Sequence, residues 1–410
     1  MSLGMVFLFF FLWRVVDFLV VFFAPRFIPY LGFFPYKDIL ASYHLPEFIT
    51  KLANFDGVHY LLIAQNGYQQ YQQAFFPLYP YLIRYLSPIF FHNPLLSGFF
   101  ISNFCFFLGL YFFYRYLLLL KIEQKSAKRA LILLLFFPTS FFFGAIYTEG
   151  LFFLLVSLTL YFLEKNHPAR YFFVAIFSFF ASLTRLAGIF LIILIIFFLL
   201  KEKKNKKKLF INHYSLLFFP LFGLVGYSFY LWQTTGDPLF FFHSQVAFGA
   251  NRSTKLILLP QVYWRYLKIL FQADFNWQYF VSLTELIIFT FVLAILIFEL
   301  LKITQLKHNQ EKKLKAWQIE NYYSFSILNF QFRILDLSRF SLNLFSIGNL
   351  LLSTFTGTFS SIPRYALLSL SFYIFLSQLN NKRLFFFLLL IFLIFHLILL
   401  AYFSQGYFVS

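Results

Sequence analysis

The sequence predicts an all-α fold, a polytopic bundle of membrane-spanning helices, from its composition and from the length of its apolar runs. Of the 410 residues, 61% are hydrophobic and 25% are aromatic, and the mean hydropathy of +0.75 is far above that of a soluble domain. The apolar residues gather in repeated runs of about 17–25 residues, the length that crosses a bilayer as a helix. Because no polar segment is long enough to fold separately, we expect residues 1–410 to form one integral membrane domain.

About eleven spans are expected, and a long loop at residues 25–94 separates the first two. The run at 4–24 is too long for the apolar region of a signal peptide, and it carries Arg14 and Asp17 one helical turn apart. We expect this pair to neutralise itself inside the bundle. The expected spans are 4–24, 95–118, 129–146, 148–164, 168–184, 186–200, 209–232, 277–301, 340–357, 363–380 and 384–403.

The net charge of +18 would suggest nucleic-acid binding in a soluble protein, but here the Lys and Arg residues concentrate in short loops. Those loops follow every second span, so the positive-inside rule explains the charge and places all of them in the cytoplasm. We therefore expect no nucleic-acid partner. The basic loops are residues 121–129, 164–170, 201–208, 302–315 and 380–383.

The polar residues suited to chemistry fall in the loops on the other side of the membrane. Asp56 and His59 are three residues apart in loop 25–94, where an i, i+3 pair on a helix would present both side chains to one ligand. Arginines on the outer face oppose the topology bias and fit a phosphate well. The candidate site residues are Asp56 and His59 as catalytic residues, and Tyr68, Glu149, Arg185, Arg364 and Tyr365 as substrate-binding residues.

Structural alternatives stay open for several of these residues. Asp56 could simply cap a helix that starts near Gly57, and Arg185 could pair with Glu149 as a clamp between two helices. Glu299, near the cytoplasmic end of its span, is expected to be solvated. His92, His213, His243 and His396 are scattered and show no metal-ligand spacing. A metal requirement is left undecided, with a divalent cation as one option.

The chemistry has to suit one outer carboxylate, a nearby histidine and a few arginines. No glycine-rich nucleotide-binding pattern is present in the sequence, which argues against nucleotide hydrolysis. Group transfer from a lipid phosphate fits, because the departing phosphate needs cations more than a protonating acid. Asp56 would act as the general base toward an acceptor hydroxyl, and His59 would orient the acceptor or meet the phosphate.

The stretch FDGVHYLLIAQNGYQQYQQAFFPLYPYLIR resembles the signature of the PIG-V family of mannosyltransferases. Three further blocks resemble the family in the same order: FFPTSFFFGAIYTEGLFFLL at 136–155, SLTRLAGIFL at 182–191 and IPRYALLSLSFYIFL at 362–376. Asp56 matches the acidic residue that is essential in the first outer loop of such enzymes. Where the family usually has Trp before this Asp, the chain has Phe55.

The resemblance implies a GT-C glycosyltransferase that moves a sugar, with mannose favoured, from a polyprenyl or dolichyl phosphate to a glycolipid or glycan acceptor. It also implies an inverting transfer like that of glycosylphosphatidylinositol anchor synthesis, in a bacterial cytoplasmic membrane, or in the endoplasmic reticulum membrane of a eukaryote. A lipid or solute transporter is the alternative, but its polar residues would cluster at the bilayer midplane. A membrane scaffold without catalysis would not need the outer acids and arginines.

Overall fold

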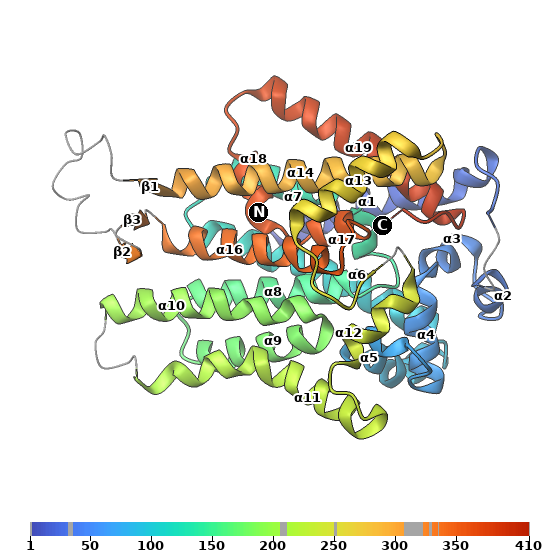
Figure 1. The fold of residues 1–410 in the computed structure, drawn as a ribbon, viewed down its shortest axis with the longest axis horizontal. Helices are drawn as coiled ribbons and strands as arrows, with labels where there is room; N and C mark the ends of the chain where they lie inside the picture. The colour runs from blue at the N-terminus through green and yellow to red at the C-terminus, as the bar shows by residue number, and fades with distance from the viewer. Residues whose placement is uncertain are drawn as a thin grey trace.

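The computed structural model describes residues 2–31, 36–205, 211–249, 252–306, 323–327, 330–334 and 336–409. Most of these residues are helical, and the long helices run along the longest axis of the molecule (Figure 1), so the predicted all-α fold class is confirmed. The first helices are α1 (Leu3–Phe23), α2 (Tyr36–Ala41), α3 (Glu47–Thr50), α4 (Asp56–Asn66), α5 (Leu78–Leu86), α6 (Pro94–Leu119), α7 (Gln124–Leu135), α8 (Glu149–Glu164), α9 (Arg170–Thr184) and α10 (Leu191–Asn205). They are followed by α11 (Phe219–Thr235), α12 (Phe240–His243), α13 (Leu259–Gln272), α14 (Trp277–Ile303), α16 (Leu337–Leu352), α17 (Ile362–Ala366), α18 (Leu370–Ser377) and α19 (Lys382–Ser404).

Five helical segments among the described residues are long and apolar enough to cross a membrane, which makes this an integral membrane protein. Three of the remaining expected spans also coincide with helices. Helices α8, α9 and α16 cover most of residues 148–164, 168–184 and 340–357, respectively. These three are 16, 15 and 16 residues long, and the count of eleven spans stays a prediction. The five segments are Leu3–Arg26, Pro94–Leu119, His213–Thr235, Trp277–Ile303 and Lys382–Ser404.

Two expected spans are interrupted by irregular backbone. Helix α7 ends at Leu135, and residues 136–148 continue as turns around one 3-10 turn, Ser140–Phe143. Pro138 lacks an N–H and cannot extend the helix. From 137 to 148 the segment is buried inside the protein, where non-helical backbone is tolerated at membrane depth. Similarly, the expected span 363–380 is divided into α17 and α18.

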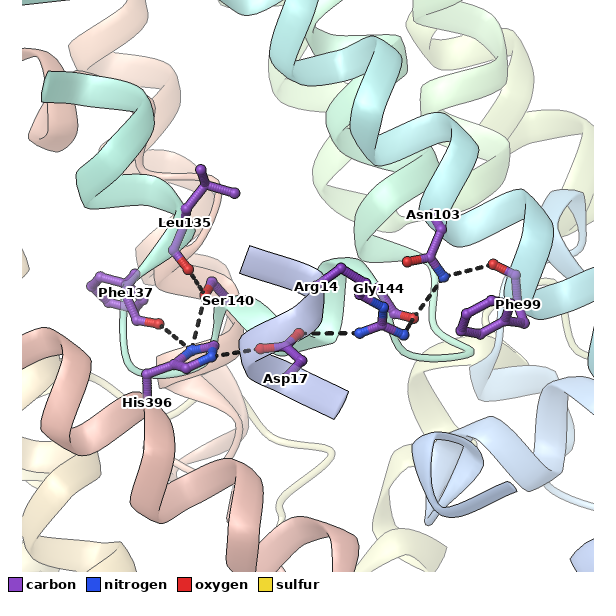
Figure 2. A network of polar contacts seen from close by, with 9 residues as sticks. All are labelled: Arg14, Asp17, Phe99, Asn103, Leu135, Phe137, Ser140, Gly144 and His396. Carbon is purple, nitrogen blue, oxygen red and sulfur yellow. Dashed lines mark hydrogen bonds and ion pairs between the residues drawn. The ribbon is translucent and has the colours of Figure 1, made fainter. Parts of the chain in front are cut away.

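A buried polar network fastens α1 and α19 to the 136–148 segment (Figure 2). As expected, Arg14 pairs with Asp17, at 3.1 Å, and both side chains are almost fully buried. The second Asp17 oxygen lies 2.8 Å from Nε2 of His396 on α19, a contact that the sequence did not reveal. Arg14 also donates to the carbonyl of Gly144 at 2.8 Å, and His396 Nδ1 lies 3.1 Å from the Ser140 hydroxyl. Charges that are expensive in a membrane are therefore paired here.

At one end of the bundle, described residues of two basic segments, 164–170 and 201–208, lie close to the start of α16. Lys201 at the end of α10 bonds Glu164 at 2.8 Å and Ser338 at 3.0 Å, which brings together the ends of α8 and α10 and the start of α16. The neighbouring Arg339 bonds Glu299 at 2.7 Å. Glu299 is only 1% exposed, so the expectation that it is solvated was wrong, because Arg339, Asn343 and Ser371 enclose its carboxylate.

A small antiparallel sheet, which the sequence did not predict, extends from this end of the bundle (Figure 1). Its strands are β1 (Thr304–Leu306), β2 (Tyr323–Ile327) and β3 (Phe330–Ile334), in the order β1-β3-β2. Thr304 pairs with Ile334, and Tyr323 pairs with the same residue from the other side. The sheet lies toward the opposite end of the molecule from α4 and α17 (Figure 1).

Candidate active site

Asp56 is the first residue of α4, and a strained backbone sets its position. Phe55 occupies the N-cap position with a φ of 61° and makes no side-chain cap, so the interpretation of Asp56 as the cap residue was wrong. A left-handed conformation at a bulky residue costs about 1–3 kcal/mol and persists only where the surroundings enforce it. Asn54 supplies that enforcement, since its carbonyl accepts from the Tyr147 hydroxyl at 2.6 Å and its amide donates to the Phe403 carbonyl at 2.9 Å.

Arg364 reaches Asp56 from the far end of the sequence. It lies on the short helix α17, which begins with Ile362 and Pro363 after Ser361, a residue with φ of 69°. Its Nη1 donates to Oδ2 of Asp56 at 2.6 Å, and its Nε lies 3.3 Å from Oε1 of Glu149. The Asp56 side chain keeps 26% of its surface exposed, whereas Arg364 keeps 12%. The carboxylate can therefore still be reached from outside.

Glu149 and Arg185 complete a cluster of two acids and two arginines, which we call the acid–arginine cluster. Glu149 begins α8 and is 1% exposed, while Arg185 follows the last residue of α9 and donates to Oε1 of Glu149. The clamp contact considered from the sequence is thus present. Within the described part of the chain, however, Oε2 of Glu149 has no hydrogen-bond partner. A buried carboxylate oxygen without a partner is costly in a structural clamp but suits a ligand hydroxyl.

Gly150 explains why α8 can begin so close to its neighbours. A Cβ atom at this position would lie 2.5 Å from the Ser102 carbonyl oxygen and 2.6 Å from that of Phe143. Both are backbone atoms, one in α6 and one in the 136–148 segment, so a side chain could not be accommodated by a rotamer change. The glycine therefore sets the depth at which Glu149 enters the cluster.

Aromatic rings cover both arginines of the cluster. Arg185 lies over the ring of Tyr365 at 4.8 Å, and Arg364 lies over Tyr147 at 5.2 Å and Phe142 at 5.5 Å. Cation–π contacts are stronger when the cation is desolvated, as it is here. Tyr365 is thus placed in the cluster as expected, whereas Phe142 is a contact that its position in an apolar run concealed.

His59 is near Asp56, but its ring makes different contacts. It stacks on Phe75 at 5.2 Å, and Nδ1 lies 3.5 Å from the Gln72 amide nitrogen. Tyr68 lies apart from the acid–arginine cluster: its hydroxyl donates to the Phe75 carbonyl at 2.8 Å, and its ring lies 6.1 Å from that of Tyr227 on α11. Phe75 therefore separates the two predicted residues.

The protonation states follow from burial and pairing. Burial alone would raise the pKa of Asp56, but the charge and hydrogen bond of Arg364 outweigh it and leave the pKa below its ordinary value of 3.8. Burial lowers the pKa of His59 below 6.5, although Asp56 opposes this shift. At neutral pH, Asp56 is therefore a carboxylate and His59 is a neutral imidazole.

The model of the family described as Mannosyltransferase (PIG-V) matches residues 4–325 of the chain. The chain belongs to this family. It is accordingly a membrane mannosyltransferase, and the predicted resemblance is confirmed. Comparison with curated proteins and comparison with solved structures each gave no match.

The PIG-V match and the geometry overlap only in part. Asp56, His59 and Glu149 lie inside the matched residues, whereas Arg364 and Tyr365 lie beyond residue 325. The ion pair between Arg364 and Asp56 nevertheless joins the two parts of the chain in one site. In this PIG-V family member the site therefore extends past the matched region.

Arg252 is a residue near the site that the sequence reasoning missed. It donates to the side-chain oxygen of Gln245 at 3.1 Å and to the hydroxyl of Ser361 at 3.5 Å, three residues before Arg364. Its position in an expected outer loop could have identified it, as it identified Arg185 and Arg364. An arginine in an expected outer loop opposes the positive-inside rule.

The described residues of the candidate site do not form a cluster of metal ligands. Across the described ranges, no three side chains of His, Cys, Asp or Glu gather closely enough to hold one. The two carboxylates of the cluster are instead engaged by Arg364 and Arg185.

Proposed function

We propose that this PIG-V family member transfers mannose from a polyprenyl-phosphate carrier to a hydroxyl of a lipid-linked or glycan acceptor on the non-cytoplasmic face. The observation that carries the proposal is the ion pair of Asp56 with Arg364, which puts a carboxylate and a guanidinium together at one accessible point. A transferase that acts on a phosphate-linked sugar needs both a base for the incoming hydroxyl and a cation for the departing phosphate.

The transfer is a single displacement at the anomeric carbon of the donor sugar. The acceptor oxygen forms a bond to that carbon while the bond to the phosphate oxygen breaks, and the phosphate leaves with the electron pair as polyprenyl phosphate. The acceptor proton passes to the Asp56 carboxylate. One displacement inverts the configuration at the anomeric carbon, so the enzyme is an inverting transferase.

The ion pair also governs when Asp56 becomes an effective base. A carboxylate whose pKa is depressed by Arg364 holds a proton weakly. The donor phosphodiester carries one negative charge, as Asp56 does, and gains a second as the polyprenyl phosphate departs. It competes with Asp56 for the same guanidinium, which binds phosphate in a planar, bidentate manner. When Arg364 turns to the phosphate, Asp56 loses its partner and its basicity rises. The base is thereby activated only with a donor in place.

The other predicted residues have roles in this mechanism that follow from their surroundings. Glu149 accepts a sugar hydroxyl through Oε2, which has no partner among the described residues. Arg185 holds Glu149 and shares the charge of the phosphate, and Tyr365 offers a ring face beside it. Neutral His59 orients the acceptor by hydrogen bonding, and Tyr68 lines the approach from the side of α11.

The site lies at the end of the bundle opposite the basic loops, which supports a location on the outer or luminal face. Helix α8 carries Glu149 at its first residue and Glu164 at its last, about 22 Å apart at 1.5 Å per residue. Glu164 bonds Lys201 of a basic loop. Since basic loops remain in the cytoplasm, the acid–arginine cluster belongs to the other side.

Substitution of Asp56 tests the reaction. With purified protein, a polyprenyl-phosphate mannose and a glycolipid acceptor, Asp56→Asn should lower transfer by about 10²–10⁴-fold, the usual contribution of a general base. Asp56→Glu should recover little, because the carboxylate is displaced. Asp38→Asn removes an exposed carboxylate of the same loop and should leave transfer unchanged. Full turnover by Asp56→Asn would exclude the mechanism.

Cysteine labelling tests the face. Cys105 is the single cysteine and is buried, so its replacement by alanine gives a background without reactive thiols. In that background, a membrane-impermeant reagent applied to intact cells should label Gln70→Cys and not Lys125→Cys. Both positions are exposed, one in the first outer loop and one in a basic loop. The reverse pattern would place the site in the cytoplasm.

A further inference from the structure

The acid–arginine cluster is electrically balanced before any substrate binds. Asp56 and Glu149 supply two negative charges, and Arg364 and Arg185 supply two positive charges that already contact them. A lipid phosphate adds negative charge to a buried region, where uncompensated charge is strongly unfavourable. Binding a phosphate there requires a further cation whose contacts are not already with an acid.

Arg252 meets this requirement by its contacts. Within the described residues, its hydrogen bonds go to a glutamine amide oxygen and to the Ser361 hydroxyl, both of which are neutral. It is partly exposed, so its guanidinium can be reached by a ligand. Burial is the largest influence on the pKa of Asp56 and raises it. The charges of Arg364, His59 and, to a smaller extent, Arg252 lower this pKa, so Arg252 is within electrostatic range of the carboxylate.

The backbone around Arg252 is fastened to the turn that precedes α17. The Ser253 N–H donates to the Thr356 carbonyl at 2.9 Å, and the Ile257 N–H donates to the Phe355 carbonyl at 3.0 Å. Arg252 itself contacts Ser361, whose N–H donates to the Glu285 carboxylate on α14 at 3.3 Å. Arg252 is therefore held beside Ser361, whose carbonyl accepts from the Arg364 N–H at 3.1 Å.

The same turn carries a hydroxyl with unmet hydrogen-bonding capacity. Ser360 is 6% exposed, and no partner for its Oγ exists within the described residues. Its own N–H donates to the Thr358 hydroxyl at 3.0 Å, which fixes the turn. A buried hydroxyl without a partner is unfavourable in the free protein and provides a donor for an oxyanion.

We propose that Arg252 is a donor-binding residue, which contacts the phosphate of the lipid-linked sugar beside Ser361, the residue that also bonds the backbone of Arg364. This assignment rests on the proposed function, because the phosphate is that of the polyprenyl carrier. The guanidinium supplies the positive charge that the balanced cluster lacks and can donate two parallel hydrogen bonds to phosphate oxygens. The hydroxyl of Ser360 adds a neutral donor in the same turn. Arg364 can then turn from Asp56 to the phosphate without leaving the site short of positive charge.

Farnesyl phosphate, which has a phosphate and a prenyl tail but no sugar, is the probe for this assignment. We expect the full-length protein in detergent to bind it, and Arg252→Gln to weaken that binding by about 10- to 100-fold, as expected for loss of a charged hydrogen-bond donor. Arg252→Lys should fall between the two, because it keeps the charge and loses the fork. Lys255→Gln removes an equal charge from an exposed residue of the same loop and should bind like the wild type.

Companion ligands separate the sources of binding. Farnesol should bind equally to wild type and Arg252→Gln, because it has no phosphate. Inorganic phosphate should compete weakly with farnesyl phosphate in the wild type, and less in Arg252→Gln. Wild-type affinity for farnesyl phosphate in both Arg252 variants would overturn the assignment. Mannose transfer is measured on the same samples to separate this failure from failure of the proposed function. If the wild type transfers mannose and the Arg252 variants bind farnesyl phosphate as the wild type does, only the role of Arg252 is rejected. If the wild type neither transfers mannose nor binds farnesyl phosphate, both proposals are rejected.

Discussion

Arg364 and Asp56 form an ion pair with 2.6 Å between Nη1 and Oδ2, although 308 positions separate them in the sequence. The pair predicts that Arg364 is needed for the donor and not only for the fold. Arg364→Ala should weaken binding of the polyprenyl-phosphate donor sharply, and Arg364→Lys should restore it only in part, since an ammonium cannot reproduce the fork. Donor affinity is measured by competition with a labelled lipid phosphate. Equal affinity in wild type and both variants would contradict the assignment.

Glu149 and Arg185 should behave as a coupled pair. Either single substitution, Glu149→Gln or Arg185→Ala, leaves a buried charge with less compensation, a change that typically costs about 3–5 kcal/mol. Both should therefore reduce the yield of folded protein. The double variant should recover part of that yield but not transfer, because Glu149 also faces the substrate through Oε2.

A double-mutant cycle on the thermal midpoint in detergent distinguishes coupling from simple addition. Additive losses from Glu149→Gln and Arg185→Ala would show that the two side chains do not stabilise one another. Full transfer by the recovered double variant would show that the pair is only a clamp.

The pH dependence of kcat/KM reports the free enzyme and should lack an acidic limb from Asp56 in the neutral range. Its folded pKa lies below 3.8, so the carboxylate and its contribution to stability persist above that value and are lost only as the pH falls through the lowered pKa. His59 also has a lowered pKa and stays neutral above its unfolded value of 6.5. We therefore expect a flat profile from pH 6.5 to 8.

His59→Gln provides the control for that profile. Below pH 6.5, protonation of His59 can produce an acidic limb in the wild-type profile. If that limb disappears in His59→Gln, it belongs to the imidazole and agrees with the structure. An acidic limb near pH 6 that persists in His59→Gln would indicate a raised Asp56 pKa and contradict the pairing with Arg364.

The sequence predicted the helical class and most helix positions because apolar runs of bilayer length are a strong, local signal. It also selected Arg185 and Arg364, since arginines in outer turns oppose the positive-inside bias, Asp56 from its spacing with His59, and Glu149 from its place in an outer turn. The structure brings these four residues together. Of the pairings among them, only that of Arg185 with Glu149 was considered from the sequence, because both residues lie at outer turns. Ion pairing across 308 positions follows from the tertiary fold, which brings the first residue of α4 within reach of Arg364 on α17, and not from any local pattern.

The misses have physical causes of the same kind. Residues 136–148 are as apolar as a spanning helix, so composition could not show that the backbone there is irregular. Glu299 was expected in solvent because its partner Arg339 lies 40 positions away on α16. Arg252 escaped notice because its loop contains no acid near it in sequence.

The Asp17–His396 contact predicts that a residue far from loop 25–94 supports the site. His396 joins α19 to Asp17 at 2.8 Å and to Ser140 at 3.1 Å, and Arg14 bonds the carbonyl of Gly144 (Figure 2). Through Ser140 and Gly144 the network fixes the 136–148 segment, whose Tyr147 ring lies against Arg364. His396→Asn is too short to keep both contacts and should leave buried groups unsatisfied, at about 1–3 kcal/mol each.

We expect His396→Asn to lower the thermal midpoint in detergent, and to lower kcat for mannose transfer in the molecules that remain folded. The KM for the donor should change little, because the network acts on the acid–arginine cluster through the 136–148 segment. His92→Asn is the matched control, since His92 is exposed and asparagine tolerates its φ of 57°. If His396→Asn and His92→Asn shared the wild-type midpoint and kcat, the network would neither stabilise the bundle nor position the 136–148 segment.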